Sequence, residues 1–313
     1  MQRVEVAAAV IMDTDRKRVL VSQRHPDSHQ GGKWEFPGGK CEPGEAFEQA
    51  LLRELHEELA ITPLQYRPFL KFTYSYPEKT IVFSVWTVDQ FTGTPRGTEG
   101  QPLQWMEINA LNPHLFPSAN RIIIQALALP ERCLISPDAG PAGDDAFLDG
   151  IGSALQRGIR LVQLRSHDLD RERYLALAGA AAELCKSHQA QLLLNMPPEW
   201  WMDNMAAGLH LPAWRLKELK HRPDIKGWVS AACHDDKELE RAQELGVDFV
   251  FVSPVKPTVS HRLGKPLGWQ GLERILSSAG VPVYALGGMQ PEDLQLAKYL
   301  GAYGIAGISA FWN

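Results

Sequence analysis

Hydrophobic and polar positions follow two different rhythms along the 313 residues of the chain. In the first part, runs rich in β-branched and aromatic residues occupy positions 4–12, 18–23, 69–76 and 80–88, which is typical of β-strands. Stretches with helical spacing interrupt them at 45–59 and 118–129, where Ser118 is a candidate N-cap. This pattern predicts an α+β fold in which helices flank a mixed sheet.

The rhythm changes after a stretch rich in Pro, Gly and Asp, "LALPERCLISPDAGPAGDD". We place a domain boundary there, which divides the chain into domains 1–131 and 132–313. Short apolar runs then alternate with helical stretches, as expected for parallel strands joined by helices. Eight such runs predict a (β/α)8 barrel: "CLIS", "IRLVQLR", "AQLLLN", "AGLHL", "WVSAA", "VDFVFVS", "VPVYAL" and "YGIAGIS".

The last predicted strand is followed only by "AFWN", which is too short for a full eighth helix. We therefore expect the barrel to lack a complete last helix. The missing helix would expose an apolar flank, and we expect the first domain or a second copy of the chain to cover it.

Composition narrows the classes of partner. The formal net charge is −5 and no long basic run occurs, which argues against broad adhesion to nucleic acids or membranes but permits a small anionic ligand. No apolar run approaches the length of a membrane span. The four cysteines are far apart, so neither a zinc motif nor a disulfide framework is indicated, and we expect a reducing cytoplasm: Cys41, Cys133, Cys185 and Cys233.

An acidic helix carries the first candidate chemistry, in "GGKCEPGEAFEQALLRELHEELAI" at residues 38–61. Glu54, Glu57 and Glu58 share one helix face, where like charges cost about 0.2–0.5 kcal/mol per pair. A hard divalent cation would offset this repulsion, and Mg²⁺, with Mn²⁺ as the alternative, prefers such oxygen ligands. Arg53 can orient a neighbouring carboxylate, and the Gly38 carbonyl is a further candidate ligand. The alternative is an acidic helix face that is merely solvated.

The spacing from Gly39 through Glu45 to "RELHEE" resembles the Nudix box. The stretches "SQRHPDSHQGGKWEFPGGK", "GTEGQPLQWM" and "LNPHLFPSAN" extend the resemblance to Nudix hydrolases of the MutT type. One position departs from the pattern, because Ala60 stands where Gly is expected. If that position is left-handed, Ala costs on the order of 1 kcal/mol relative to Gly, with a small shift of the helix exit and no loss of ligands.

The resemblance implies hydrolysis of 8-oxo-dGTP to the monophosphate and pyrophosphate, with attack on the β-phosphorus. It places metal on the Gly38 carbonyl, Glu54, Glu57, Glu58 and Glu99. It also implies catalytic roles for Glu54, Glu58 and Glu99, of which Glu54 or Glu99 would be the general base. A simpler alternative for Glu99 is an exposed loop acid.

Recognition of the nucleotide would use four residues. The resemblance implies that Asn120 addresses the purine edge, since a carboxamide offers a donor and an acceptor, and that Phe36 lies beside the base. Arg24 and His29 would contact sugar or phosphate. Simpler alternatives remain for each: a helix cap for Asn120, core packing for Phe36, and solvated surface positions for Arg24 and His29.

The second domain resembles thiamine phosphate synthase and its TenI-type relatives through "VQLR", "AGLHL", "VFVSPVKPTVSH", "KPLGWQGL", "VYALGGM" and "YGIAGISA". Loops after the seventh and eighth strands of such barrels commonly bind phosphate. The candidate residues of a barrel phosphate site are Arg165, Thr258, Ser260, Gly287, Gly288 and Ser309. Ordinary turn chemistry is the alternative for the Gly and Ser/Thr positions.

The barrel departs from the synthase pattern on its catalytic side. Arg165 is followed by "SH" instead of x-Lys, Asn195 is followed by Met196 instead of Asp, and "PAWR" follows "AGLHL" where a further Asp is expected. Without these carboxylates a metal for a pyrophosphate leaving group has no ligands, so we expect a degenerate synthase. His167 and His261 are candidates for a metal-free proton transfer, as in a TenI-type tautomerase.

Three hypotheses follow. The first is a magnesium-dependent hydrolase of oxidised purine triphosphates fused to a degenerate barrel. The second is a Nudix domain that acts on thiamine-pathway diphosphates. The third makes the barrel a non-catalytic sensor or docking module for a phosphate ligand.

Overall fold

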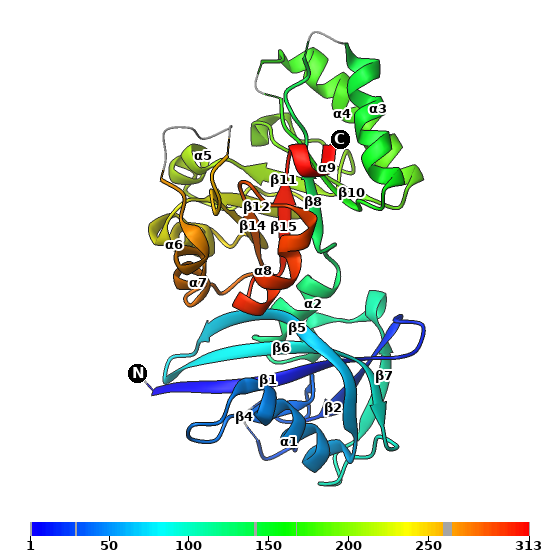
Figure 1. The fold of residues 1–313 in the computed structure, drawn as a ribbon, viewed down its shortest axis with the longest axis vertical. Helices are drawn as coiled ribbons and strands as arrows, with labels where there is room; N and C mark the ends of the chain where they lie inside the picture. The colour runs from blue at the N-terminus through cyan, green and yellow to red at the C-terminus, as the bar shows by residue number, and fades with distance from the viewer. Residues whose placement is uncertain (1, 29, 141–142, 167, 259–264, 313) are drawn as a thin grey trace. The chain divides into compact units, whose positions relative to one another are not determined.

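The computed structural model describes residues 2–28, 30–140, 143–166, 168–258 and 265–312. The chain divides into two compact units, Met1–Ala128 and Leu129–Asn313. Each unit has its own β-structure, a mixed sheet in the first and a closed barrel in the second (Figure 1). The two predicted fold classes are confirmed, and the boundary after Glu131 stays a prediction.

The first unit is built on a seven-stranded sheet in the order β3-β2-β1-β6-β5, with β4 paired to β1 and β7 paired to β2. β1 runs parallel to β6, whereas its pairs with β2 and β4 are antiparallel. The sheet is therefore mixed, as predicted. Its strands are β1 (Gln2–Met12), β2 (Arg18–Gln23), β3 (Trp34–Glu35), β4 (Gly38–Lys40), β5 (Thr62–Ser75), β6 (Lys79–Thr92) and β7 (Leu103–Glu107).

Two helices accompany this sheet, α1 (Phe47–Leu59) and α2 (Asn120–Leu127). Helix α1 lies along β1 and β4 (Figure 1), because its apolar positions recur at helical spacing and pack on the small residues of β1. The buried cluster contains Ala50, Leu51, Leu55 and Leu59 of α1 with Ala7, Ala9 and Ile11 of β1.

The predicted N-cap of α2 is wrong. The capping position is Ala119, in right-handed helical geometry and without a side-chain cap. A turn leads into the helix instead, since the carbonyls of Pro117 and Ser118 accept hydrogen bonds from the backbone N–H groups of Asn120 and Arg121. The turn therefore satisfies the first N–H groups of the helix with backbone atoms.

The second unit is a closed barrel of eight parallel strands in the order β10-β11-β12-β13-β14-β15-β8-β9. All eight strands coincide with the apolar runs predicted from the sequence. They are short and almost wholly buried, as expected for strands covered on both faces: β8 (Arg132–Ile135), β9 (Leu161–Leu164), β10 (Gln191–Leu194), β11 (Gly208–Leu211), β12 (Trp228–Cys233), β13 (Phe249–Val252), β14 (Val283–Leu286) and β15 (Gly304–Gly307).

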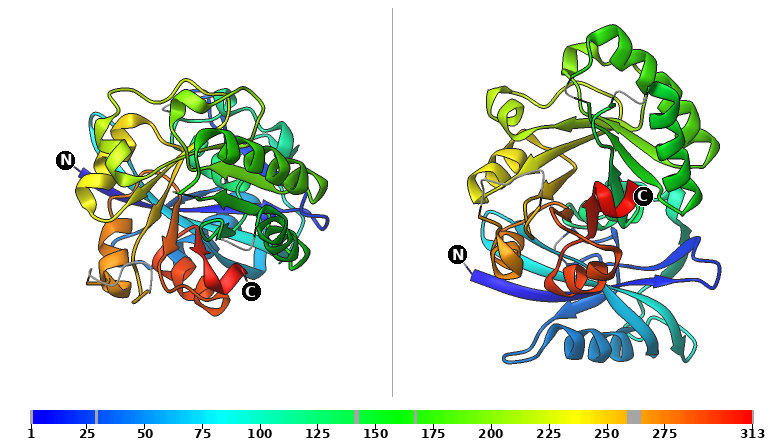
Figure 2. Two further views of the ribbon diagram at one scale, coloured as in Figure 1. Left: turned by 90° about the horizontal axis from the view of Figure 1, so that it is seen from above. Right: turned by 45° about the horizontal axis from the view of Figure 1, so that its top comes forward.

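Helices lie around the outside of these strands (Figure 2). They are α3 (Asp144–Gln156), α4 (Arg171–Ser187), α5 (Ala213–Glu218), α6 (Asp236–Leu245), α7 (Gly268–Leu276), α8 (Leu294–Leu300) and α9 (Ser309–Trp312). The last helix described, α9, is one turn long. Its Trp312 ring packs on Phe147 of α3 at 5.3 Å between centroids, and the Arg157 guanidinium donates to the Phe311 carbonyl at 2.8 Å.

Within the described part of the chain, no helix combines the length and apolarity needed to cross a bilayer. The four cysteines are all free thiols.

Candidate functional site

The glycine loop and helix α1 meet in the first unit. Strand β4 pairs with β1 in a register that sets Gly38 opposite Ala8 and Gly39 opposite Ala7. The carboxyl group of Glu54 lies directly against Gly39, where an added Cβ would stand 2.2 Å from Glu54 Cδ. Gly38 has φ +134°, which favours glycine. Gly39 therefore lets the backbone approach the Glu54 carboxylate.

Arg53 fixes the outer carboxylates of the acidic helix. Its guanidinium donates two hydrogen bonds of 2.9 Å to Glu45, one of 2.9 Å to Glu54 and one of 3.0 Å to Glu57. Hydrogen bonding by Arg53, with a backbone bond from Glu42, lowers the pKa of Glu45 to about 2. The exposed Glu57 is thus held beside Arg53 at the solvent side of the helix.

Glu58 faces inward. Its Oε2 accepts a hydrogen bond from the Gly38 N–H at 3.2 Å. Burial, together with the nearby charges of Glu54, Glu35 and Glu99, raises the pKa of Glu58 to about 8, although the Gly38 bond opposes this. The acidic groups are therefore close enough to disfavour one another's charge, which is the situation that a bound cation relieves.

The loop of Glu99 is anchored to the end of α1. Thr98 N–H and the Gln101 carboxamide both donate to the Glu58 carbonyl, at 3.0 and 3.1 Å. Gln101 Oε1 also accepts from the Glu99 N–H at 2.9 Å. These bonds bring the exposed Glu99 to the rim of a cavity of about 500 Å³ that Glu35 and Glu58 also line.

The predicted metal ligands are neighbours but do not all converge. Among the residues that the structure describes, no three His, Cys, Asp or Glu side chains stand in a metal-binding arrangement. Arg53 holds the exposed Glu57 on the solvent side of α1. The donor set of carboxylates nevertheless suits a hard divalent ion.

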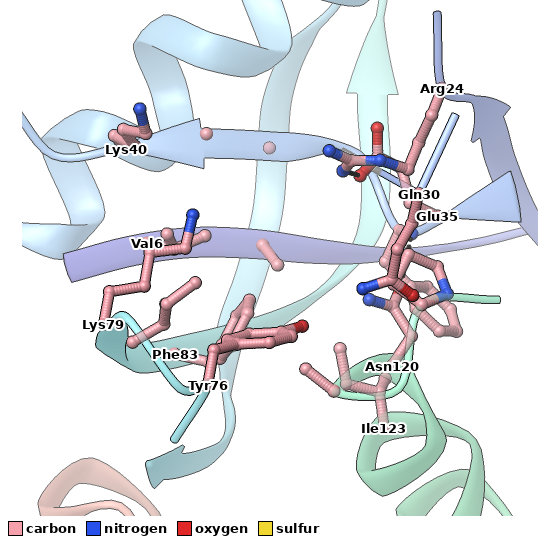
Figure 3. A pocket seen from close by; sticks show the side chains of 17 residues that line it. Val6, Arg24, Gln30, Glu35, Lys40, Tyr76, Lys79, Phe83, Asn120 and Ile123 are labelled. Carbon is pink, nitrogen blue, oxygen red and sulfur yellow. Dashed lines mark hydrogen bonds and ion pairs between the residues drawn. The ribbon is translucent and has the colours of Figure 1, made fainter. Parts of the chain in front are cut away.

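A second cavity, of about 220 Å³, lies beside the first and contains the predicted base-recognition residues (Figure 3). Asn120 is the first residue of α2 and is buried. Its Oδ1 accepts the backbone N–H of Phe36 at 3.2 Å, so its side chain does not cap the helix. The Phe36 ring stacks on Phe116, with centroids 5.8 Å apart.

Tyr76 and Glu35 are among the residues that line this cavity without having been predicted. Tyr76 extends its hydroxyl toward the side of the cavity that holds Asn120 (Figure 3). Glu35, one residue before Phe36, lines both cavities together with Arg24. Burial raises the pKa of Glu35, and Arg24 opposes that effect. Glu35 lies in a strand and not among the spaced acids of helix α1. Sequence reasoning missed it for that reason. His29 lies outside the described residues.

The barrel contains a separate pocket of about 470 Å³ at the carboxyl ends of its strands. Five predicted phosphate-site residues line it: Arg165, Thr258, Gly287, Gly288 and Ser309. The two glycines have φ +92° and +67°, and an added Cβ on either would stand 2.7 Å from a neighbouring atom, so the turn requires glycine. Ser260 lies outside the described residues.

No Asp or Glu lines this pocket among the residues described. Gln163 is 2% exposed, and its Oε1 has no hydrogen-bond partner within the described structure. An N–H donor from a ligand would satisfy that oxygen. The pocket therefore combines a turn suited to an anion with a buried acceptor.

Two pocket histidines were also missed. His234 Nδ1 is 2.7 Å from the Ser253 carbonyl, and the backbone N–H of His234 donates to Glu238 at 2.8 Å. A carbonyl partner requires a proton on Nδ1, which leaves Nε2 as the basic nitrogen. His210 Nδ1 lies 3.0 Å from Ser230 Oγ. Only their proximity to the pocket in space could have singled out His234 and His210. His167 and His261, which we predicted, lie outside the described residues.

The folds and sites define two kinds of unit in one chain, an α+β unit with a carboxylate-lined cavity and a (β/α)8 barrel with a pocket at the carboxyl ends of its strands. A NUDIX domain model matches residues 1–127, and a model described as thiamine monophosphate synthase matches residues 133–311. The chain belongs to the Nudix family through its first unit and to the thiamine monophosphate synthase family through its second. The first unit is a Nudix hydrolase.

The relatives divide in the same way. The 8-oxo-dGTP diphosphatase of Escherichia coli (strain K12) is 40% identical over 127 residues, covering 41% of this chain and 98% of that protein. Putative thiamine-phosphate synthase 2 of Aquifex aeolicus (strain VF5) is 36% identical over 167 residues, covering 53% of this chain and 89% of that protein. A solved MutT NUDIX hydrolase from Burkholderia pseudomallei is 26% identical with a TM-score of 0.37, covering 40% of this chain and 98% of its own.

Proposed function

We propose that the Nudix unit hydrolyses 8-oxo-dGTP to the monophosphate and pyrophosphate. The observation that carries this proposal is the pair of adjoining cavities. One contains Asn120, whose amide orientation is fixed by Phe36, and the other is lined by Glu35, Glu58 and Glu99. A purine in the cavity of Asn120 and phosphates in the cavity of Glu58 and Glu99 would match the two environments.

Asn120 supplies the base recognition. Because its Oδ1 accepts the Phe36 N–H, its NH₂ group is oriented as a donor toward an acceptor on the purine edge. Phe36 adds the wall of the cavity beside the base, and Arg24 pairs with phosphate or sugar oxygens. These roles follow the sequence prediction and remain proposals.

The carboxylates supply the reaction. Glu54, Glu58, Glu99 and the Gly38 carbonyl would hold Mg²⁺ or Mn²⁺, and Glu57 would join them on release from Arg53. The ion supplies neutralisation of the phosphate charge. Glu54 or Glu99 takes the proton from the attacking water, and Arg53 keeps Glu54 oriented through their 2.9 Å bond. Catalysis is then mainly positioning and charge compensation.

A substrate panel with one sharp variant tests this function. Asn120→Asp keeps an oxygen for the Phe36 N–H but replaces the NH₂ donor by a second oxygen. We expect wild-type protein to prefer 8-oxo-dGTP over dGTP, and the variant to lose at least about tenfold of that preference, since a mispaired buried hydrogen bond costs about 1–3 kcal/mol. Asn112→Asp is the matched control, because Asn112 also accepts a backbone N–H, from His114 at 3.0 Å.

Two results would reject this substrate. One is equal turnover of dGTP and 8-oxo-dGTP by the wild type. The other is a preference for hydroxymethylpyrimidine diphosphate, which would favour the thiamine-pathway hypothesis.

For the barrel we propose metal-independent binding of a phosphate-bearing ligand and proton transfer by His234. The absence of carboxylates from the described lining, together with the fixed Nδ1 of His234, supports this candidate.

In EDTA, inorganic phosphate should raise the melting temperature of the full chain. His234→Gln should keep that rise and abolish tautomerase activity. Phosphate binding without any tautomerase activity in the wild type would favour a sensor, and condensation activity would contradict the proposal.

A further inference from the structure

Arg24 and Glu35 stand where the two Nudix cavities adjoin, and both side chains line both cavities. Arg24 Nη1 donates to Glu35 Oε2. The two side chains are 26% and 28% exposed, so the pair is largely shielded from water. Its charges therefore act more strongly than those of a surface pair.

The backbones of both residues are held in place. Arg24 N–H donates to the Lys33 carbonyl at 2.9 Å, and the Gly32 N–H donates to the Arg24 carbonyl at 3.1 Å. Glu35 lies in β3, opposite Ser22 of β2. Hydrogen bonds and strand pairing therefore anchor the backbone on both sides of the ion pair.

We infer that the Arg24–Glu35 ion pair is a latch between two cavities, the base cavity, which contains Asn120, and the acidic cavity, which Glu58 and Glu99 line. A polyphosphate opens this latch by drawing Arg24 away from Glu35. A nucleotide that reaches from one cavity into the other passes this pair. Its phosphates attract the planar guanidinium, which binds phosphate in the same forked manner as carboxylate, and repel the Glu35 carboxylate.

The exchange has a consequence for the acidic cavity. Once Arg24 leaves, Glu35 loses its counterion on the wall that it shares with Glu58 and Glu99. Its carboxylate then adds to the negative charge that a divalent cation compensates. Glu35 is therefore a positioning residue, through which the binding of phosphate changes the charge in the acidic cavity. The inference rests on the proposed function only in taking a polyphosphate as the ligand.

The test measures binding without metal. Calorimetry in EDTA is carried out with tripolyphosphate and with 8-oxo-dGTP on the full chain. Glu35→Gln keeps the size and a hydrogen-bond acceptor but removes the charge, so it should bind tripolyphosphate about 5- to 30-fold more tightly, as expected for a released coupling. Arg24→Met should weaken binding at least about fivefold, and Arg24→Lys should weaken it less than Arg24→Met does.

The double variant separates a latch from simple repulsion. In the Arg24→Met background, Glu35→Gln should raise the logarithm of the tripolyphosphate affinity by less than half as much as it does in the wild-type background. No guanidinium remains there to be released. Asp89→Asn is the matched control. Asp89 forms an ion pair with Arg16 at 2.8 Å and lines neither cavity. It should leave tripolyphosphate affinity unchanged.

Unchanged affinity in Glu35→Gln overturns the latch, and so does a full gain in the Arg24→Met background. Failure of the proposed function gives a different result. Tripolyphosphate carries no base, so its binding tests the latch alone. If the Glu35→Gln effect on tripolyphosphate persists while 8-oxo-dGTP shows no advantage over dGTP, the proposed substrate is rejected and the latch is retained. Circular dichroism of each variant confirms folding.

Discussion

At the scale of single residues, the carboxylates of the Nudix unit differ in environment although they share one helix. Glu57 is exposed and paired with Arg53, Glu54 lies against Gly39, and Glu58 is turned inward to the Gly38 N–H. The same side-chain chemistry therefore has three electrostatic settings within five residues. Each setting leads to a different expectation on substitution.

Glu54→Gln tests the residue that combines the proposed ligand and base roles. The substitution keeps the shape that fits against Gly39 but removes the charge, so turnover should fall by at least about 10²-fold. Pyrophosphate release under saturating substrate measures the effect. Glu48→Gln, on the same helix and bonded to the Tyr66 hydroxyl at 2.8 Å, should keep wild-type turnover. A near-normal rate for Glu54→Gln would mean that another acid carries these roles.

His210 makes the stability of the barrel depend on pH. Burial lowers the pKa of His210 to about 3, below the value of about 6.5 for an unfolded chain. The unfolded state therefore takes up a proton below pH 6.5 while the folded state stays neutral, so stability is complete above pH 6.5 and declines as the pH falls toward 3. The contribution approaches about 1.4 kcal/mol per pH unit in that window.

Urea unfolding of the full chain at pH 7 and pH 5 measures this loss. His210→Gln should reduce the difference between the two pH values, whereas His221→Gln, at an exposed position, should leave it unchanged. The same pH dependence in wild type and His210→Gln would show that His210 is already charged in the folded protein.

At the scale of elements, strong hydrophobic patterns were predicted well and weak ones were not. All eight barrel strands and the long Nudix strands follow from runs of apolar residues. Strands β3, β4 and β7 escaped prediction because they are short or partly exposed and contain Gly, Lys or Glu, so their pairing partners define them. The acidic helix was predictable from spacing, whereas Glu35 and His234 join their sites only through folding.

The end of α1 gives an element-scale prediction. Ala60 adopts φ 54° and ψ 36°, in the left-handed region, which confirms that the position needs the geometry of the Gly expected there. Ala60→Gly should stabilise the protein by about 1 kcal/mol, because the Cβ strain disappears. Ala128→Gly is the control, since Ala128 ends α2 in right-handed geometry and should not be stabilised. Urea unfolding compares the two, and a loss of stability in Ala60→Gly would contradict the strain argument.

At the scale of the whole molecule, each unit has its own sheet and its own buried cluster. The contacts of residues 129–131 bear on where the second unit begins. The Leu129 and Pro130 carbonyls accept hydrogen bonds from the Tyr303 and Tyr284 hydroxyls, and Glu131 pairs with Lys298. These contacts argue for including residues 129–131 with the barrel, although composition alone suggested a boundary after Glu131.

Two truncated chains decide between these starting points. The Lys298 side chain is 1% exposed and forms an ion pair with Glu131, so a barrel that starts at residue 132 leaves a buried ammonium without this carboxylate. Breaking such a pair costs about 3–5 kcal/mol, and the loss of two carbonyl acceptors adds to it. A barrel that starts at Leu129 should therefore unfold at clearly higher urea concentration than one that starts at Arg132. Glu131→Gln in the full chain isolates the ion-pair contribution, and it should show part of the same loss. Equal midpoints for the two truncated chains would place the boundary after Glu131.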